Sequence, residues 1–202
     1  MPRPFSKQLE AWLKSRQPKT INGLLETFGE KSFAIVVLVL MFIPALPIPT
    51  GGITHIFELI VMLLALEMIA GRRTLWLPKK VLKRPLGTVL TGKAVPLMVK
   101  QIRWFERFSR PRFGKFINHR ITYVFTGVVF FLLALAAALA PPFSGLDTIP
   151  SLAAVIISLA LILDDAVIFI IGTVLSVVGM VLVFLTAHAT LQLFHHIFGS
   201  VF

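Results

Sequence analysis

The positively charged residues of this 202-residue chain are confined to two blocks. All 20 lysines and arginines lie in residues 1–31 or 72–120, and the stretches outside these blocks are strongly apolar. A water-soluble core element has apolar and polar faces because one side meets water, and these stretches show no such polar face. The sequence therefore predicts an all-helical integral membrane protein, since a helix satisfies its own backbone hydrogen bonds within lipid.

Membrane orientation explains the net charge of +11. Segments that flank spans on the cytoplasmic side carry an excess of Lys and Arg, and such segments also attract anionic lipids. Tryptophans and phenylalanines occur within the basic blocks, where their rings suit the membrane interface. We therefore expect a multi-pass protein with both basic blocks in the cytoplasm. Its expected partners include the lipid bilayer and the anionic lipids of the cytoplasmic face, and exclude nucleic acid.

The chain is short enough to form a single membrane domain. Phe5, Leu9 and Trp12 are spaced to share one helical face opposite Lys7, which predicts a helix lying in the plane of the interface. A second interfacial helix is predicted within residues 99–116. The domain divides into an amphipathic N-terminal segment (1–31), a broken helical hairpin (32–70), a basic cytoplasmic belt (71–120) and a second membrane half (121–202).

Proline- and glycine-rich breaks interrupt both apolar halves. As one helix, residues 32–70 would be about 58 Å long, nearly twice a bilayer core of about 30 Å. Proline lacks an amide hydrogen and clashes with the preceding turn, so a helix does not continue through such a break. Residues 121–140 form a clear span, and 151–187 are again too long for one, so we expect four or five membrane-inserted helices. The break residues are Pro44, Pro47, Pro49, Gly51, Gly52, Pro141, Pro142 and Pro150.

The two halves follow a similar order. Shifting the first half by 97 positions places Pro44 on Pro141 and Glu67 on Asp164. Internal repeats with broken helices are typical of transporters, although apolar segments also resemble one another through composition alone. A two-fold internal repeat is therefore one interpretation. The first arm is short for a full span, so a re-entrant hairpin is an alternative to two crossings.

Four stretches of the chain are similar to a known family. They are PALPIPTGG (44–52), GRRTLWLP (71–78), RWFERFSRPR (103–112) and PPFSGLDTIPS (141–151). Together with an acidic pair that follows them, they resemble the exopolysaccharide-synthesis ExoD family of bacterial membrane proteins. The resemblance implies a role in exopolysaccharide production at the bacterial inner membrane. It implies polysaccharide-synthesis proteins or further copies of the chain as partners, and it names no reaction or cofactor.

The resemblance assigns two motifs to particular residues. The family's acidic site reads acid-Asp-Gly, which Asp164 and Asp165 match, whereas Ala166 replaces the glycine and makes a sharp turn there less expected. The family's motif at the exit from the membrane is carried by Gly71, Arg72, Arg73, Trp76, Leu77 and Pro78.

Carboxylates near apolar segments are candidate ion or proton sites, because a charge at the bilayer centre costs about 2.5–3.5 kcal/mol. Asp164 and Asp165 have two interpretations: a hairpin loop that caps the next helix, or a proton or cation site. Glu67 either pairs with Arg72 and Arg73 at the membrane edge or contributes to the same site.

His55 and Glu58 lie three residues apart, on one face of a predicted helix that follows the first break. This spacing predicts a hydrogen bond within the bundle or a pair that lines a polar path. No third ligand is evident in the sequence, so we expect no metal at this pair.

Enzyme interpretations find little support, and we expect that the protein is not an enzyme. The sequence has no nucleophile-elbow motif, no glycine-rich phosphate loop and no metal-binding cluster of suitable spacing. The first hypothesis is a small ion- or proton-coupled transporter or channel that uses the acidic residues. The alternative is a non-transporting accessory subunit of a polysaccharide synthesis or export complex, which acts through the basic belt.

Overall fold

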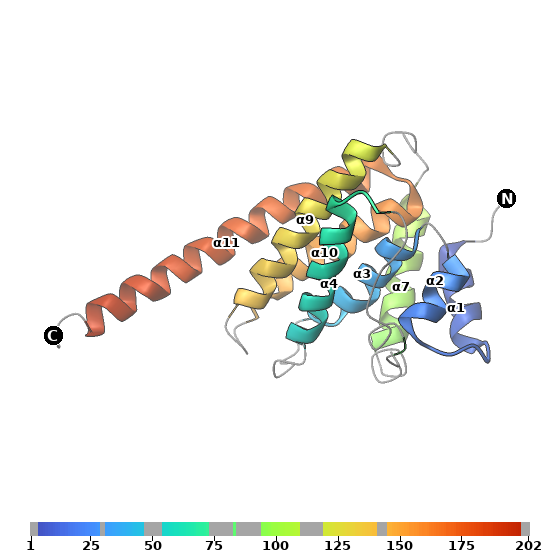
Figure 1. The fold of residues 1–202 in the computed structure, drawn as a ribbon, viewed down its shortest axis with the longest axis horizontal. Coiled ribbons are helices and arrows are strands. Elements are labelled where there is room, and N and C mark those ends of the chain that lie inside the picture. The colour runs from blue at the N-terminus through green and yellow to red at the C-terminus, as the bar shows by residue number, and fades with distance from the viewer. Residues whose placement is uncertain are drawn as a thin grey trace.

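The computed structural model describes residues 4–28, 31–46, 54–72, 83, 94–109, 119–140 and 145–198. Within these ranges the regular structure consists of eight helices and no β-strand, which confirms the all-helical prediction. The helices are α1 (Phe5–Lys14), α2 (Ile21–Phe28), α3 (Ser32–Phe42), α4 (Thr54–Ile69), α7 (Ala94–Phe108), α9 (Arg120–Leu139), α10 (Thr148–Leu163) and α11 (Ala166–Phe198) (Figure 1).

The helix boundaries follow the predicted breaks. α3 ends at Phe42, two residues before Pro44, and α4 begins at Thr54. Pro150 lies in the first turn of α10, where a missing N–H removes no helical hydrogen bond. α9 coincides with the predicted span. The other break residues lie outside the described residues: Pro47, Pro49, Gly51, Gly52, Pro141 and Pro142.

α3 forms the centre of the bundle. All 11 of its residues are buried, because α10, α4 and α2 pack around it. A helix that is apolar all round has no face for water, so burial on every side is the expected outcome. Eleven residues make a helix of about 16 Å, which is too short to cross a bilayer core of about 30 Å.

The two apolar halves of the chain pack crosswise, with the second helix of each half on the first helix of the other. α4 packs most extensively along α9, and α10 packs along α3, so each second arm lies on the first arm of the other half. Gly127 of α9 permits the contact with α4: a Cβ there would lie 3.0 Å from both the carbonyl oxygen of Ala65 and the amide nitrogen of Ile69. This crosswise packing is compatible with the two-fold repeat, which remains a prediction.

The helix ends that adjoin the basic blocks meet at one end of the bundle. Phe33 in the first turn of α3 makes an edge-on ring contact with Tyr123 of α9, with centroids 6.1 Å apart. The Tyr123 hydroxyl donates to the carbonyl oxygen of Arg72, just after α4, over 2.9 Å. Lys31, just before α3, donates to the carbonyl oxygen of Ile162 near the end of α10. α3 and α9 therefore begin, and α4 and α10 end, at the same end of the bundle.

Two described helical segments are long and apolar enough to cross a membrane, Arg120–Leu139 of α9 and Ala166–Thr186 of α11. Large apolar side chains are exposed along α4, α9 and α11, and a bilayer would cover them. α11 continues well beyond the other helices at its C-terminal end (Figure 1). These features indicate membrane association. Insertion of further helices, to a total of four or five, remains a prediction.

The N-terminal segment differs from its prediction. The apolar face of α1, which we expected to meet the membrane interface, is covered by protein: Leu9 is 0% exposed and Trp12 is 3% exposed. α7 packs against α1, and on this face the Phe28 ring lies edge-on to the rings of Phe5 and Trp12. α7 contains most of the second predicted interfacial helix, and its apolar side chains are not all exposed to the interface, because Ile102 is buried whereas Phe108 is exposed.

Candidate functional site

Asp164 and Asp165 form the tight turn between α10 and α11. Asp164 adopts the left-handed conformation, with φ 55° and ψ 36°, and the Asp165 amide donates to the carbonyl oxygen of Ala160 over 3.0 Å. Asp165 Oδ1 then accepts from the amide of Val167 over 2.9 Å and caps α11. The capping contact predicted for this pair is therefore present at Asp165, and the alternative of a proton or cation site stays a prediction. Ala166 begins α11, so the sharp turn lies at Asp164 and needs no glycine at 166.

The Asp164 carboxylate is paired within the chain. Lys31 Nζ lies 2.6 Å from Asp164 Oδ2 and also 2.6 Å from the carbonyl oxygen of Ile162. Both side chains are only partly covered, at 43% exposed for Lys31 and 28% for Asp164. Lys31 also fixes the position of the turn, because it binds α10 through both a side chain and a backbone carbonyl.

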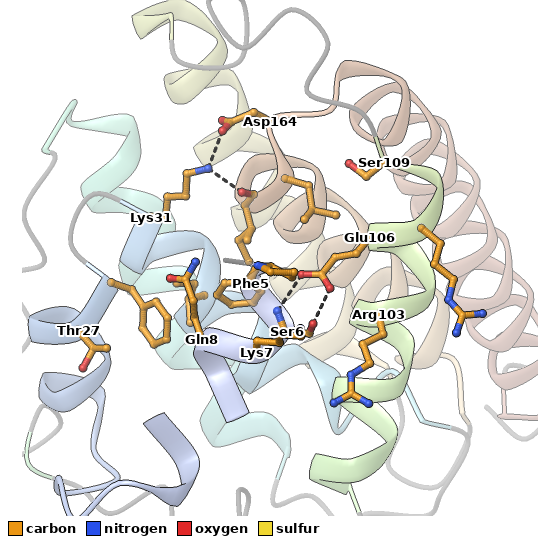
Figure 2. Close-up of a pocket in the computed structure, with 16 residues that line it drawn as sticks. Phe5, Ser6, Lys7, Gln8, Thr27, Lys31, Arg103, Glu106, Ser109 and Asp164 are labelled. Carbon is orange, nitrogen blue, oxygen red and sulfur yellow. Dashed lines mark hydrogen bonds and ion pairs between the residues drawn. The ribbon is translucent and has the colours of Figure 1, made fainter. Parts of the chain in front are cut away.

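The same ion pair lies at the edge of a cavity between α1, α2, α3, α7 and the end of α10 (Figure 2). The cavity volume is about 930 Å³ and it is open to the outside. Its charged lining residues are Lys7, Lys31, Arg103, Arg107, Glu106 and Asp164, and its uncharged polar side chains are Ser6, Gln8, Thr27 and Ser109. Cations outnumber carboxylates by four to two, which makes the cavity basic.

Two contacts hold α1 against α7 beside this cavity. Glu106 accepts hydrogen bonds from the Ser6 amide over 2.8 Å and from the Ser6 hydroxyl over 2.5 Å, as Figure 2 shows. Arg103 forms an ion pair with Glu10. Glu106 thus caps the first turn of α1 from another helix. Sequence reasoning missed this contact, because no local pattern relates residues that are 100 positions apart.

The predicted pair on α4 is present and lies at the opposite end of the bundle from Lys31. His55 Nδ1 and Glu58 Oε2 are 2.8 Å apart, and Glu58 is completely buried. Among the described residues, Glu58 Oε1 and the equally buried Ser151 hydroxyl of α10 have no hydrogen-bond partner, and the same holds for the buried Asp164 Oδ1 and the Trp12 indole nitrogen. Asp147, at the start of α10, lies close enough to act electrostatically on Glu58. Within the described ranges no three side chains of metal-binding type gather, so this polar cluster has no third metal ligand there.

The predicted exit motif begins with a helix-ending turn. Gly71 has φ 73°, its amide donates to the carbonyl oxygen of Met68 over 2.9 Å, and the Arg72 amide donates to that of Glu67 over 3.0 Å. These two hydrogen bonds form the motif that ends many helices at a left-handed glycine. Glu67 therefore lies in the last turn of α4, and its backbone carbonyl accepts one of these two hydrogen bonds. Arg73, Trp76, Leu77 and Pro78 lie outside the described residues.

A family profile described as "Exopolysaccharide synthesis, ExoD" matches residues 5–185. The chain belongs to the ExoD family. The match runs from the first residue of α1 to near the end of the candidate span in α11, so the acidic turn and every lining residue of the basic cavity except Pro4 lie within the matched region. Membership in the ExoD family links the chain to exopolysaccharide synthesis, and the family description names a process rather than a reaction.

Two relatives of the ExoD chain are informative. An uncharacterized protein of Synechocystis sp. is 30% identical over 186 residues, which is 89% of this chain and 85% of that protein. The protein named ExoD of Rhizobium meliloti is 26% identical over 153 residues, which is 72% of this chain and 61% of that protein. No solved structure matches the chain.

Proposed function

We propose that the protein is a non-transporting accessory component of exopolysaccharide synthesis in the bacterial inner membrane. α9 and α11 cross the bilayer, and the end of the bundle that carries Lys31 and Arg72 faces the cytoplasm. Its partners are anionic lipids and proteins of polysaccharide synthesis or export. Catalysis is assigned to those partners and not to this chain.

The ion pair between Lys31 and Asp164 is the observation that carries this proposal. A transporter that used the acidic pair would need both carboxylates near the middle of the membrane, facing a path. Here Asp164 is bound to a cation at the basic end of the bundle, and Asp165 caps α11. Both carboxylates therefore have structural roles at the membrane edge.

The outer surface of α7 supports an interfacial role. Trp104 and Phe108 are 56% and 67% exposed, and their ring centroids are 5.1 Å apart. Lys100 and Arg107 are exposed on the same helix. Exposed aromatic rings beside cations suit the boundary between lipid head groups and water, where the ring is half-immersed and the cation meets phosphate.

Complementation of a strain that lacks the gene tests the accessory role. Asp164→Asn combined with Asp165→Asn removes both charges but keeps residues that tolerate the left-handed turn and the cap. We expect exopolysaccharide yield close to that of the unsubstituted protein. Arg73→Gln with Trp76→Ala, in the exit motif, is expected to reduce the yield strongly at equal protein level. Loss of yield with the two asparagines alone, at equal protein level, would refute the accessory role.

Proton or cation movement through the other end of the bundle is a second candidate function. The observation that favours it is the buried Glu58 carboxylate, which has His55 on one oxygen and no described partner on the other. In proteoliposomes, a pH gradient that dissipates with the unsubstituted protein but not with Glu58→Gln would favour transport. Equal leakage from both, at the level of empty vesicles, would exclude it.

A further inference from the structure

We propose that the basic cavity between α1, α7 and the α10–α11 turn binds a phosphate group, with Lys31 shared between Asp164 and that phosphate. This site goes beyond the accessory role and does not require it, since the cavity is defined by the chain's own residues. The ligand class is a phosphate ester, carried either by a lipid head group or by a free small molecule.

The charges around the cavity favour an anion. Four cations and two carboxylates line it, and both carboxylates already accept hydrogen bonds from the chain. Glu106 accepts from the Ser6 amide and hydroxyl, and Asp164 accepts from Lys31. Lys7 is exposed at the cavity, and no ion pair joins it to any described carboxylate. Arg103 is already paired with Glu10 and Lys31 with Asp164, so the positive charge left for a ligand comes from Lys7, from Arg107 and from the third donor of Lys31.

Lys31 is placed to serve both partners. Its ammonium group has three donors, and the described contacts use two of them, on Asp164 Oδ2 and on the Ile162 carbonyl. The side chain is 43% exposed, so an anion in the cavity can reach the third donor. Figure 2 shows Lys31 extending along the cavity edge towards Asp164.

The uncharged part of the lining favours a phosphate on an apolar stem. Phe5, Phe28, Ile35 and Leu163 line the cavity together with the cations. A volume of about 930 Å³ is far more than a phosphate ion needs and falls within the range of sites for organic ligands. The cavity shares Arg103 and Arg107 with a second groove between α1 and α7, whose lining includes the exposed Trp104. The cavity therefore borders the surface that we place at the lipid interface.

Two matched pairs of lysines separate a site from general attraction to anionic surfaces. Lys7 and Lys31 line the cavity only, whereas Lys14 and Lys100 line the neighbouring groove only. We would reconstitute each double Lys→Gln variant in nanodiscs of neutral lipid with a small fraction of phosphatidic acid. Bound phosphatidic acid would be measured by native mass spectrometry. A parallel arm would titrate inorganic phosphate into detergent-purified protein by calorimetry. Thermal unfolding would verify that every variant is folded.

We expect Lys7→Gln with Lys31→Gln to weaken phosphate binding about ten-fold or more. Each substitution removes a charged hydrogen-bond donor, and such hydrogen bonds contribute substantially to the affinity for an anion. Lys14→Gln with Lys100→Gln should change it less than about two-fold, because those lysines contribute only screened long-range attraction. A difference seen with phosphatidic acid identifies a lipid head group, and one seen with inorganic phosphate identifies a soluble ester. Equal effects of the two variants in both arms, or no binding in either, overturn the proposal.

A single substitution gives a change in the opposite direction. Asp164→Asn removes the carboxylate that competes for Lys31, so phosphate binding should tighten several-fold. Glu26→Gln, at an exposed residue of α2 that does not line the cavity, adds the same net charge and should have less effect. A purely structural Lys31–Asp164 pair predicts no tightening, and that result would overturn the shared role of Lys31.

Discussion

Lys31 and Asp164 are 133 residues apart in the sequence, yet Lys31 Nζ lies 2.6 Å from Asp164 Oδ2. The same ammonium group binds the carbonyl oxygen of Ile162, so one cation holds the start of α3 against the end of α10. This contact joins the two halves of the chain at the end where the basic residues gather. It also supplies the Asp164 charge with a partner from within the protein.

A double-mutant cycle on Lys31 and Asp164 measures the strength of this contact. Since both side chains are partly exposed, we expect Lys31→Gln to lower the free energy of unfolding by about 1 kcal/mol or less. The effect should shrink when Asp164→Asn is already present. Thermal unfolding of the four proteins in detergent provides the cycle. Strictly additive effects would show that the pair contributes nothing to stability.

Substitution of Asp165 tests the cap on α11. Asp165→Ala removes the oxygen that accepts from the Val167 amide, so we expect a loss of about 0.5–2 kcal/mol in the free energy of unfolding. Asp165→Asn keeps an accepting oxygen, so its free energy of unfolding should remain within a few tenths of a kcal/mol of that of the unsubstituted protein. If alanine and asparagine destabilise equally, the charge and not the cap is what matters at this position.

Gly71 ends α4 in a conformation that other residues rarely adopt. With φ at 73°, Gly71→Ala should destabilise the protein by about 1–2 kcal/mol through backbone strain. Among the described residues beyond its chain neighbours, the nearest atom to an added Cβ is 3.8 Å away, on the Arg120 side chain, so steric contact with them contributes little. Gly71→Asn is the control, because asparagine tolerates this region better. Equal unfolding temperatures for alanine and glycine at this position would contradict the assignment.

The close contact between α4 and α9 depends on Gly127. A methyl group there would lie 2.9 Å from the Met68 Cβ and 3.0 Å from backbone atoms of α4, so the helices would have to separate. We expect Gly127→Ala to cost about 1–3 kcal/mol, as overpacked cores usually do. Val128→Ile adds a methyl group on the exposed side of the same helix and should be nearly neutral. Similar unfolding curves for the two variants would argue against this packing.

The sequence predicts the elements that depend on local chemistry. Pro44 predicts the C-terminal end of α3, and an uninterrupted apolar run predicts α9. An acidic residue before an apolar run predicts the cap at Asp165. The hydrogen bond between His55 and Glu58 also follows from spacing on one helix. Each of these features involves neighbours within a few residues, for which helical geometry fixes the distances.

Features that depend on how distant segments pack were not predictable from one sequence. The amphipathic pattern of α1 is the same for a helix on lipid and a helix on protein. The hydrogen bonds from Ser6 to Glu106 of α7, 100 residues away, hold α1 against protein. The pairing of Asp164 with Lys31 likewise required the fold. The basic cavity is formed by residues of five elements, so no spacing along the chain reveals it.

Water access to residue 164 tests the central claim most directly, since the chain has no native cysteine. Asp164→Cys would be exposed to a membrane-impermeant maleimide in intact cells and in inverted vesicles, with Ile171→Cys as the lipid-facing control on α11. We predict rapid labelling of position 164 in inverted vesicles only, and no labelling of position 171 in either. Labelling of position 164 from both sides would place the turn in a transmembrane path and contradict the accessory role, and labelling from the outside only would contradict the cytoplasmic orientation.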